Sequence, residues 1–361
     1  MSCSMREGKE QILFEKILGC LAMVAIGDAL GMPAHDMTID EIRKRFGGSI
    51  RDLKSPFKDS RVHSGMKAGQ ITDDAGLTFQ VAKAYIEHRG KITPPVIGEY
   101  VAEWVNEATS KGLSSMIGGS TKQAVQRING GLDPIRECRK DKNPMMGATN
   151  GGAMKISPAG LAHPGNIEGA IRDAVSICLP THGTQTAISA ACAIAAGVSE
   201  AMRLQATVFS VAKAALTGAI RGEALGIKKG RVAPLPSVPE RIKLAITMAI
   251  KADNIEEANR LFSNVLGTGL AAYESIPTAI GIFVACNGEP RQCVIAGANV
   301  GYDTDTIASM AGALSGTLKG FSHVPNDWYR AVEEVNGLNL ISLAEELTAL
   351  SLRNYPYGHA V

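Results

Sequence analysis

The chain has 361 residues, with 37 basic and 35 acidic side chains and a formal net charge of +2. This near balance, without a basic stripe interleaved with aromatic residues, argues against a nucleic-acid backbone as partner. No charge run, low-complexity tract or Ser/Gly linker divides the sequence, so residues 1–361 are expected to form one domain.

The N-terminus and the cysteines favour a soluble, cytoplasmic protein. Residues 1–11 are polar and charged, and the apolar run 17–26 is too short to cross a bilayer, so no membrane partner is expected. Seven cysteines occur without C-x-x-C spacing. We interpret them as core residues rather than as disulfides or metal ligands. Those in apolar helical surroundings are Cys20, Cys178, Cys192 and Cys286.

Helical periodicity runs through most of the chain, and strand-like alternation is almost absent, which predicts a compact all-α fold. Ala308, Gly312 and Gly316 repeat at i, i+4 and i+8, a spacing that lets two helices approach closely. No repeat period appears, which argues against a helical solenoid. Helices are expected at residues 11–30, 76–89, 95–106, 121–129, 167–176, 184–202, 207–222, 239–252, 254–266, 272–286, 289–299, 304–320 and 325–352.

The first expected helix carries an acidic residue, Asp28, near its otherwise apolar end. A buried carboxylate is costly without partners, so we assign Asp28 a structural role at the helix end or behind a site. The polar loop 55–70, which contains Phe57 and His63, comes directly before the next acidic segment and is placed to rim a site.

Two short acidic segments stand at opposite ends of the chain, Thr72-Asp73-Asp74 and Asp303-Thr304-Asp305-Thr306. Their oxygen donors are of the hard type that Mg²⁺ and Mn²⁺ prefer, and two such ions can share a bridging carboxylate, so the pair fits a two-metal site. The alternative is that each segment caps the apolar helix that follows it. Because adjacent carboxylates repel unless a cation screens them, and the motif occurs twice, we favour the metal site.

A glycine-rich loop spans residues 147–158. Its backbone is free to lie against a ligand and offer N–H groups to phosphate or ribose oxygens, although a tight turn between helices has the same composition. Lys155 is expected to be an exposed charge, unless the loop holds a diphosphate and Lys155 pairs with it. His182 precedes an alanine-rich helix and lines a cleft or fills a structural position.

Five motifs in this order resemble those of the ADP-ribosylglycohydrolases, the group related to dinitrogenase reductase-activating glycohydrolase, the eukaryotic ADP-ribosylhydrolases and J1-type crystallins. The resemblance covers nearly the whole chain. The motifs are Gly27-Asp-Ala-Leu-Gly-Met-Pro33, Thr72-Asp73-Asp74, Thr149-Asn-Gly-Gly-Ala-Met154, Pro180-Thr-His182 and Asp303-Thr-Asp-Thr306.

The resemblance implies a single large orthogonal helical bundle with a central binuclear metal cleft. Two Mg²⁺ ions, with Mn²⁺ as the alternative, would bind the ribose hydroxyls and position water beside the anomeric carbon, and carboxylates would stabilise an oxocarbenium-like transition state. The implied metal ligands are Thr72, Asp73, Asp74, Asp303, Asp305 and Thr306. The implied catalytic carboxylates are Asp73, Asp74 and Asp305. The implied substrate-binding residues are Gly147, Thr149, Asn150, Gly151, Gly152, Met154 and His182.

The chain departs from this family's pattern at two positions. Tyr302 stands where many members have glycine before the second metal segment, and it is expected to narrow the cleft, stack on a base, or pack into the core. His35 stands where many members have glutamate, which leaves Asp36 as a shifted carboxylate or His35 as a catalytic proton carrier. We expect Tyr302 and His35 to lie within a side-chain length of the metals and to make a smaller ribose pocket.

The resulting expectation is Mg²⁺-dependent hydrolysis of a ribosyl glycosidic bond in an ADP-ribosylated protein or small molecule. One alternative is a hydrolase of nucleosides or other small N-glycosides. Another is a catalytically silent ADP-ribose-binding or crystallin-like protein, against which the intact ligand set argues. The sequence leaves the oligomeric state open.

Overall fold

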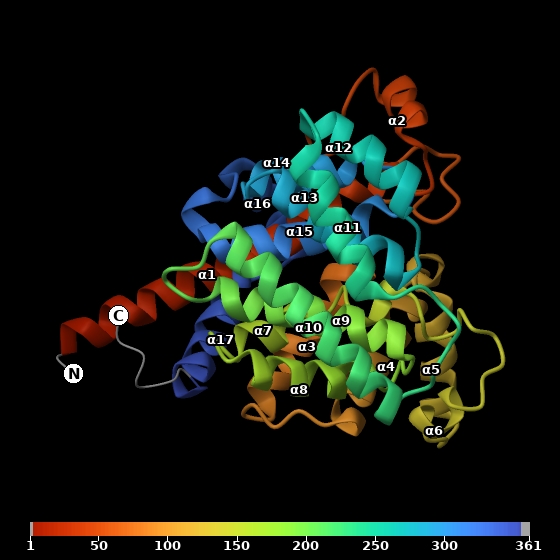
Figure 1. Cartoon of the computed structure of the whole chain (residues 1–361), viewed down its shortest axis with the longest axis vertical. Helices are drawn as coiled ribbons and strands as arrows, with labels where there is room; N and C mark the ends of the chain where they lie inside the picture. Colours follow the sequence, from red (N-terminus) through yellow and green to blue (C-terminus); the bar gives the residue numbers. More distant parts are fainter. Residues whose placement is uncertain (1–2, 355–361) are drawn as a thin grey trace.

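The computed structural model describes residues 3–354, which form 17 α-helices with no strand among them. The predicted all-α fold is confirmed, and Figure 1 shows the helices crossing at widely different angles. The helices are α1 (Cys3–Gly31), α2 (Ile39–Phe46), α3 (Asp73–Glu87), α4 (Pro94–Ser110), α5 (Gly119–Asn129), α6 (Pro134–Cys138), α7 (Ser157–Leu161), α8 (Ile167–Cys178), α9 (Gln185–Ala201), α10 (Val208–Lys229), α11 (Val238–Lys251), α12 (Ile255–Leu261), α13 (Ala272–Ala285), α14 (Pro290–Ala298), α15 (Thr304–Lys319), α16 (Asn326–Asn336) and α17 (Leu340–Asn354).

The centre of the molecule is an antiparallel pair of helices, α1 and α15, from opposite ends of the chain (Figure 1). Glycines bring their backbones into direct contact: a methyl group on Gly312 would lie 2.3 Å from the backbone oxygen of Met23, and one on Gly316 would lie 2.2 Å from that of Gly19. The close approach predicted from the glycine spacing is therefore confirmed. It fixes the end of α1 beside the start of α15.

Helix α1 is longer and more apolar than the sequence indicated. The helical stretch Gly8–Ala34, which comprises most of α1 and the turn that follows it, has the length and mean hydropathy, 1.8, of a membrane span, but its most apolar window is 100% buried against the rest of the protein. A core helix of a globular protein has the same properties.

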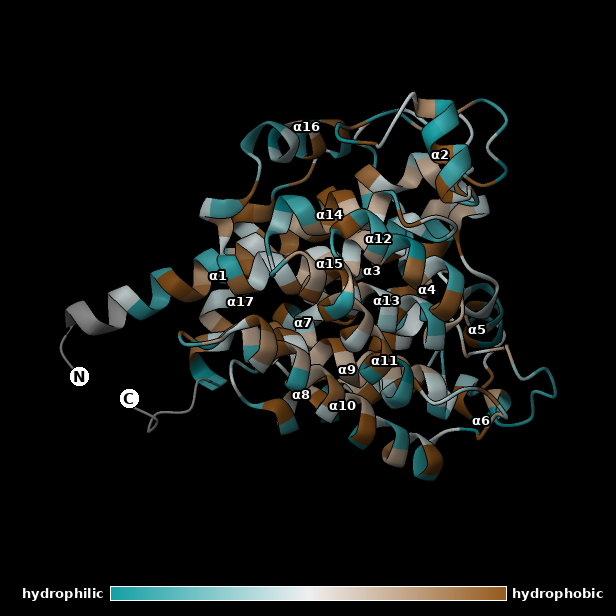
Figure 2. Cartoon of the chain, turned by 45° about the horizontal axis from the view of Figure 1, so that its top comes forward, coloured by the Kyte–Doolittle hydropathy of each residue, from teal (hydrophilic) through white to brown (hydrophobic). Residues whose placement is uncertain are grey.

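A second buried helix, α9, lies between α10, α8 and α15, and every one of its residues is buried. Its alanines and serines allow neighbours to pack closely on all sides. Hydrophilic residues gather instead on outer elements such as α2 and α16 (Figure 2). The cysteines interpreted as core residues, Cys20, Cys178, Cys192 and Cys286, are indeed buried and free.

One expected helix is divided in the structure, and three short helices, α2, α6 and α7, were not expected. The continuous helix expected at 325–352 is divided into α16 and α17, because Gly337 ends α16 in a left-handed conformation with φ 61°. Helix α2 was not predicted, although Thr38 and Glu41 form a reciprocal capping box at its start.

Candidate active site

The N-termini of α3 and α15 meet in one cleft, which brings the two acidic segments together. Thr306 donates a hydrogen bond to the Asp74 carboxylate at 3.2 Å across this junction. Thr72, not an aspartate, caps α3, and the Asp303 side chain makes no capping bond to α15 in the described structure. Helix capping therefore does not account for these carboxylates.

The cleft encloses a cavity of about 240 Å³ at this junction. It gathers most of the residues singled out from the sequence. Those lining it are His35, Asp73, Asp74, Thr149, Asn150, Gly151, Met154, His182, Asp303, Asp305 and Thr306.

Asp28 supports this cleft from behind. Its carboxylate accepts hydrogen bonds from the backbone N–H groups of Thr72 (2.8 Å) and Ala75 (3.0 Å) and from the Thr72 hydroxyl (2.9 Å). These bonds hold the first turn of α3 against the end of α1. This geometry agrees with the structural role expected for Asp28. The bond from Thr72 to Asp28 also turns the Thr72 hydroxyl toward Asp28 rather than toward the cavity.

Two buried carboxylate oxygens in the cleft lack a hydrogen-bond partner within residues 3–354: Asp74 Oδ1 and Asp303 Oδ1. The other oxygen of Asp303 accepts a short bond from the side-chain amide of Asn150, which joins the glycine-rich loop to α15. An unpaired buried anionic oxygen is costly unless a cation or a bound ligand compensates it.

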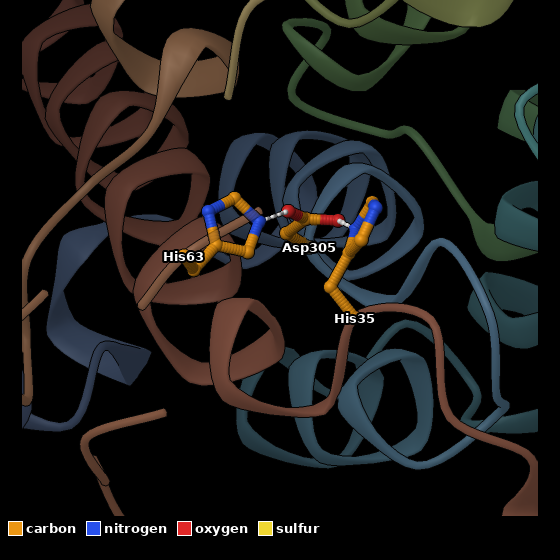
Figure 3. Close-up of side chains that lie close together, drawn as sticks. All are labelled: His35, His63 and Asp305. Carbon is orange, nitrogen blue, oxygen red and sulfur yellow. Dashed lines mark hydrogen bonds and ion pairs between the residues drawn. The ribbon is translucent and has the colours of Figure 1, made fainter. Parts of the chain in front are cut away.

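His35 and His63 flank Asp305 (Figure 3). His35 Nδ1 lies 2.9 Å from Asp305 Oδ1, and His63 Nε2 lies 3.1 Å from Asp305 Oδ2. One ligand atom from each of the three residues lies within 4.8 Å of the others, so the group has the composition and spacing to hold a metal ion. His35 therefore points into the cleft, as expected.

Several carboxylates lie close together in the cleft, and their mutual repulsion raises the pKa of most of them. Burial and the charge of Asp305 raise the pKa of Asp73 to about 7 and that of Asp303 to about 8. Burial and the charges of Asp28 and Asp305 raise the pKa of Asp74 well above its usual value. Protonation relieves the repulsion in the metal-free protein, and cations would relieve it equally well.

Asp305 is the exception among these acids. Burial opposes its ionisation, but the charge of His35 and hydrogen bonds from His35 and His63 outweigh burial and hold the pKa of Asp305 well below its usual range. In return, although burial alone would lower it, the charges of Asp305, Asp303 and Asp36 raise the pKa of His35 to about 10. Asp305 is therefore the carboxylate that stays ionised at neutral pH.

Hard oxygen donors, unpaired carboxylate oxygens and mutual repulsion together fit a divalent cation site. The two acidic segments supply such donors at this junction, although the Thr72 hydroxyl is engaged by Asp28.

The glycine-rich loop forms part of the cavity wall and contacts the second acidic segment through Asn150. Thr149 Oγ1 lies 3.0 Å from His182 Nε2, and Gly151 packs so closely on the His182 ring that a methyl group there would lie 2.8 Å from Cε1. Burial and the charge of Lys155 lower the pKa of His182 well below its usual value, so the ring is neutral. Gly147 and Gly152 shape this loop without lining the cavity.

The exposed position expected for Lys155 is wrong. Its side chain is fully buried and donates to the Gly151 carbonyl and the Thr181 hydroxyl (3.2 Å). Lys155 therefore braces the loop from within, and its ammonium group is not turned to an external diphosphate.

Tyr302 is not where the sequence indicated. It has 46% exposure and does not line the cavity. Tyr302 and Asp36 both have left-handed backbones, with φ of 61° and 68°, and Asp36 N–H donates to the Tyr302 carbonyl at 2.8 Å. Tyr302 N–H in turn donates to the Met37 carbonyl at 2.7 Å. This backbone pairing, which we call the 36/302 clasp, ties together the segments that carry His35 and Asp303.

Sequence reasoning missed part of the wall. His63 was noted only as a member of a rim loop, and its bond to Asp305 was not foreseen. The segment from Ser115 to Gly119 also lines the cavity, and it carried no recognisable motif.

The whole chain can be compared with known proteins. The family model for ADP-ribosylglycohydrolase matches residues 9–356. Protein YegU of Escherichia coli (strain K12) is 30% identical over 92% of this chain and 96% of its own length. Human ADP-ribosylhydrolase ARH3 is 24% identical, covering 87% of this chain and 88% of its own.

A solved structure has the same fold. It is described as an ADP-ribosylglycohydrolase-related protein complex, and it superimposes with a TM-score of 0.67 and 20% identity, covering 94% of this chain and 99% of that chain. The match of the family model over nearly all of the sequence settles the relationship: the chain belongs to the ADP-ribosylglycohydrolase family and is a glycohydrolase.

Proposed function

We propose that the protein hydrolyses a ribosyl glycosidic bond with the help of divalent cations, and that its substrate is an ADP-ribosylated protein or small molecule. The observation that carries this proposal is the meeting of two acidic helix N-termini at one cavity, with unpaired oxygens on Asp74 and Asp303. The name of the relative ARH3, an ADP-ribosylhydrolase, supports the substrate class. We also propose a cytoplasmic location.

The cations are two Mg²⁺ ions, with Mn²⁺ as the alternative. When bound, they supply positive charge beside the ribose diol and lower the pKa of water. The residues proposed to hold them are Thr72, Asp73, Asp74, Asp303, Asp305 and Thr306.

The chain's own carboxylates perform the proton transfer. Water attacks the anomeric carbon, the glycosidic bond breaks with its electron pair leaving on the departing group, and a carboxylate accepts the water proton and passes it to the departing group. Asp73, whose side chain lines the cavity, is the carboxylate that we assign to this role. With cations bound, Asp74 and Asp305 would both be ionised and would stabilise the positive charge that develops on the ribose ring, and His35 holds Asp305 in place.

The glycine-rich loop orients the substrate. Thr149, Asn150 and Gly151 face the cavity together with Met154 and His182. Because Lys155 is buried, any contact to a diphosphate would come from backbone N–H groups or from the cavity rim.

The size of the cavity favours a second candidate function. Its volume of about 240 Å³ is below the roughly 300–1,000 Å³ of sites that enclose drug-sized ligands. A ribosyl unit fits such a space, whereas the rest of ADP-ribose would lie outside it. Hydrolysis of a nucleoside or another small N-glycoside therefore stands as the alternative.

The test combines substrates with metal-site variants. Asp303→Ala and Asp305→Ala should lose at least about 100-fold in turnover while keeping the helical circular dichroism spectrum. Release of free ADP-ribose from an ADP-ribosylated protein, compared with release of a base from a nucleoside, separates the two substrate classes. Near wild-type turnover of either variant at saturating Mg²⁺ would contradict the metal assignment.

A further inference from the structure

Helix α10 lies at the periphery of the bundle, and its outer face is apolar (Figure 2). Its inner face packs so closely on α9 that a methyl group on Gly218 would lie 2.2 Å from the Cys192 backbone oxygen. On the opposite side, Phe209, Ile220 and Ile227 have exposed fractions of 62%, 50% and 55%. Single exposed apolar residues are common on protein surfaces, but a row of them on one helix marks a surface for binding.

The outer face of α10 has a heptad pattern. Its members are separated by four, three, four, three and four residues, which is the spacing of a and d positions in a coiled coil. We call this line of side chains the α10 seam; its members are Phe209, Lys213, Leu216, Ile220, Glu223 and Ile227. Each of them is exposed or half-buried, and at 1.5 Å per residue the seam extends about 27 Å along the surface.

The order of residues in the α10 seam is self-complementary about Gly218. The pairs that lie two, five and nine residues before and after this glycine are Leu216 with Ile220, Lys213 with Glu223, and Phe209 with Ile227. When two identical helices run antiparallel about a two-fold axis at Gly218, each seam residue faces the other member of its pair in the second copy. Apolar residues then meet apolar residues, and each base meets an acid.

The two charged residues make a second copy the best occupant of this face. Neither Lys213 nor Glu223 has an ion-pair partner within residues 3–354. In the antiparallel arrangement Lys213 faces the partner's Glu223, and a charged residue in a coiled-coil seam fixes register and orientation. A parallel arrangement would place identical charges opposite each other. An anionic lipid surface would attract Lys213 but repel Glu223.

We propose that the protein forms a two-fold symmetric homodimer through the α10 seam, with the two copies of α10 packed antiparallel at a shallow crossing angle. An interface built on one helix from each subunit is at the small end of specific interfaces, so the dimer should be weak, with a Kd on the order of 10 μM. No seam residue lines the cavity between α3 and α15, so this inference is independent of the proposed function.

The experiment measures association of the full chain by sedimentation equilibrium from about 1 to 200 μM. Lys213→Glu gives a seam with acids at both charged positions, and Glu223→Lys gives a seam with bases at both. Ile220→Asp removes an apolar contact near the two-fold axis. Ile341→Asp is the matched control, because Ile341 is an isoleucine with 44% exposure on α17, outside the seam. Circular dichroism melting checks that each variant is folded.

The wild type should dimerise, and Ile220→Asp should raise the Kd at least about 10-fold, whereas the control should leave it unchanged. Lys213→Glu and Glu223→Lys should each associate at least about 10-fold more weakly than the wild type. The two charge variants should form a heterodimer when mixed, because acids then face bases. Both substitutions in one chain should restore the affinity of the wild type.

A wild type that stays monomeric at the highest concentration would overturn the inference. If that monomer bound vesicles containing phosphatidylserine, the apolar face of α10 would be a membrane-binding surface instead. Dimerisation that Ile220→Asp leaves unchanged would place the contact elsewhere on the molecule. Charge variants that fail to associate on mixing would refute the antiparallel pairing of Lys213 with the partner's Glu223.

Discussion

At the scale of single residues, the 36/302 clasp shows how backbone conformation can matter more than side-chain identity. Tyr302 was singled out for its large ring, yet the ring is half-exposed and outside the cavity, and the residue's left-handed backbone is what joins two site-bearing segments. Glycine adopts a positive φ without steric cost, whereas a tyrosine does not, so Tyr302 is an unusual residue at this position.

The stability of variants at position 302 should therefore depend on how well the new residue tolerates a positive φ. Tyr302→Gly is expected to change the free energy of unfolding by less than about 1 kcal/mol, because relief of backbone strain offsets the lost ring contacts with Gly269. Tyr302→Val, with a β-branched side chain, should lose about 1–2 kcal/mol more than Tyr302→Gly in urea denaturation. Equal stability of the two variants would show that the clasp is not under strain.

Lys155 gives a second prediction at this scale, which concerns pH. Burial lowers the pKa of Lys155 from 10.5 to about 8. The unfolded chain therefore binds more protons between pH 8 and 10.5, and the contribution of Lys155 to the free energy of unfolding rises with pH across that window.

The measurement compares the wild type with Lys155→Met by chemical denaturation at pH 7.5 and pH 10. The wild type should gain up to about 3 kcal/mol relative to the variant at the higher pH. Groups that titrate in both proteins cancel in this difference. If the difference in the free energy of unfolding between the two proteins does not change with pH, Lys155 is not buried as a charged group.

At the scale of helices, the contact of α1 with α15 positions the site. Gly312→Ala should destabilise the protein by about 1–3 kcal/mol or more, since the new methyl group would meet backbone atoms that cannot move aside without separating the helices. Gly8→Ala is the matched control. Gly8 lies in the exposed first part of α1, where an added methyl group would have no atom within 4 Å. A loss of stability in Gly8→Ala equal to that in Gly312→Ala, measured by guanidinium denaturation, would refute the packing argument.

The helices themselves were largely predictable, and the exceptions have physical causes. The division between α16 and α17 was encoded by Gly337, but the apolar period continues across it and masks the break. Helix α2 is short and mostly exposed, so it has little apolar periodicity, and the capping box was the stronger indication.

At the scale of the whole molecule, the site could be predicted from sequence only where a motif carried it. The acidic segments and the glycine-rich loop were found because their composition is unusual. The burial of Lys155 and the bond from His63 to Asp305 depend on long-range packing that leaves no local pattern.

Ligand binding should be visible in the stability of the complete molecule. ADP-ribose is expected to raise the melting temperature when Mg²⁺ or Mn²⁺ is present, since a ligand at about 100 times its Kd stabilises the native state by about 2.7 kcal/mol. Without a divalent cation the shift should be much smaller, because the ribose would meet carboxylates instead of metal. A scanning fluorimetry series with ADP-ribose, ribose and a nucleoside checks this.

In that series, a nucleoside that stabilises as strongly as ADP-ribose would support the small N-glycoside alternative. Stabilisation by ADP-ribose that is independent of the cation would contradict the proposed metal dependence.

The pairing of α1 with α15 also has a consequence for the timing of synthesis. Asp74 and Thr306 are 232 residues apart, and at roughly 5–20 residues per second the ribosome needs on the order of 10–50 s to travel between them. Throughout that interval α1 has emerged without the helix that covers it, and its apolar face is open to chaperones or to aggregation. The first acidic segment is synthesised long before the second, so a nascent chain that stalls before Asp303 has no catalytic centre.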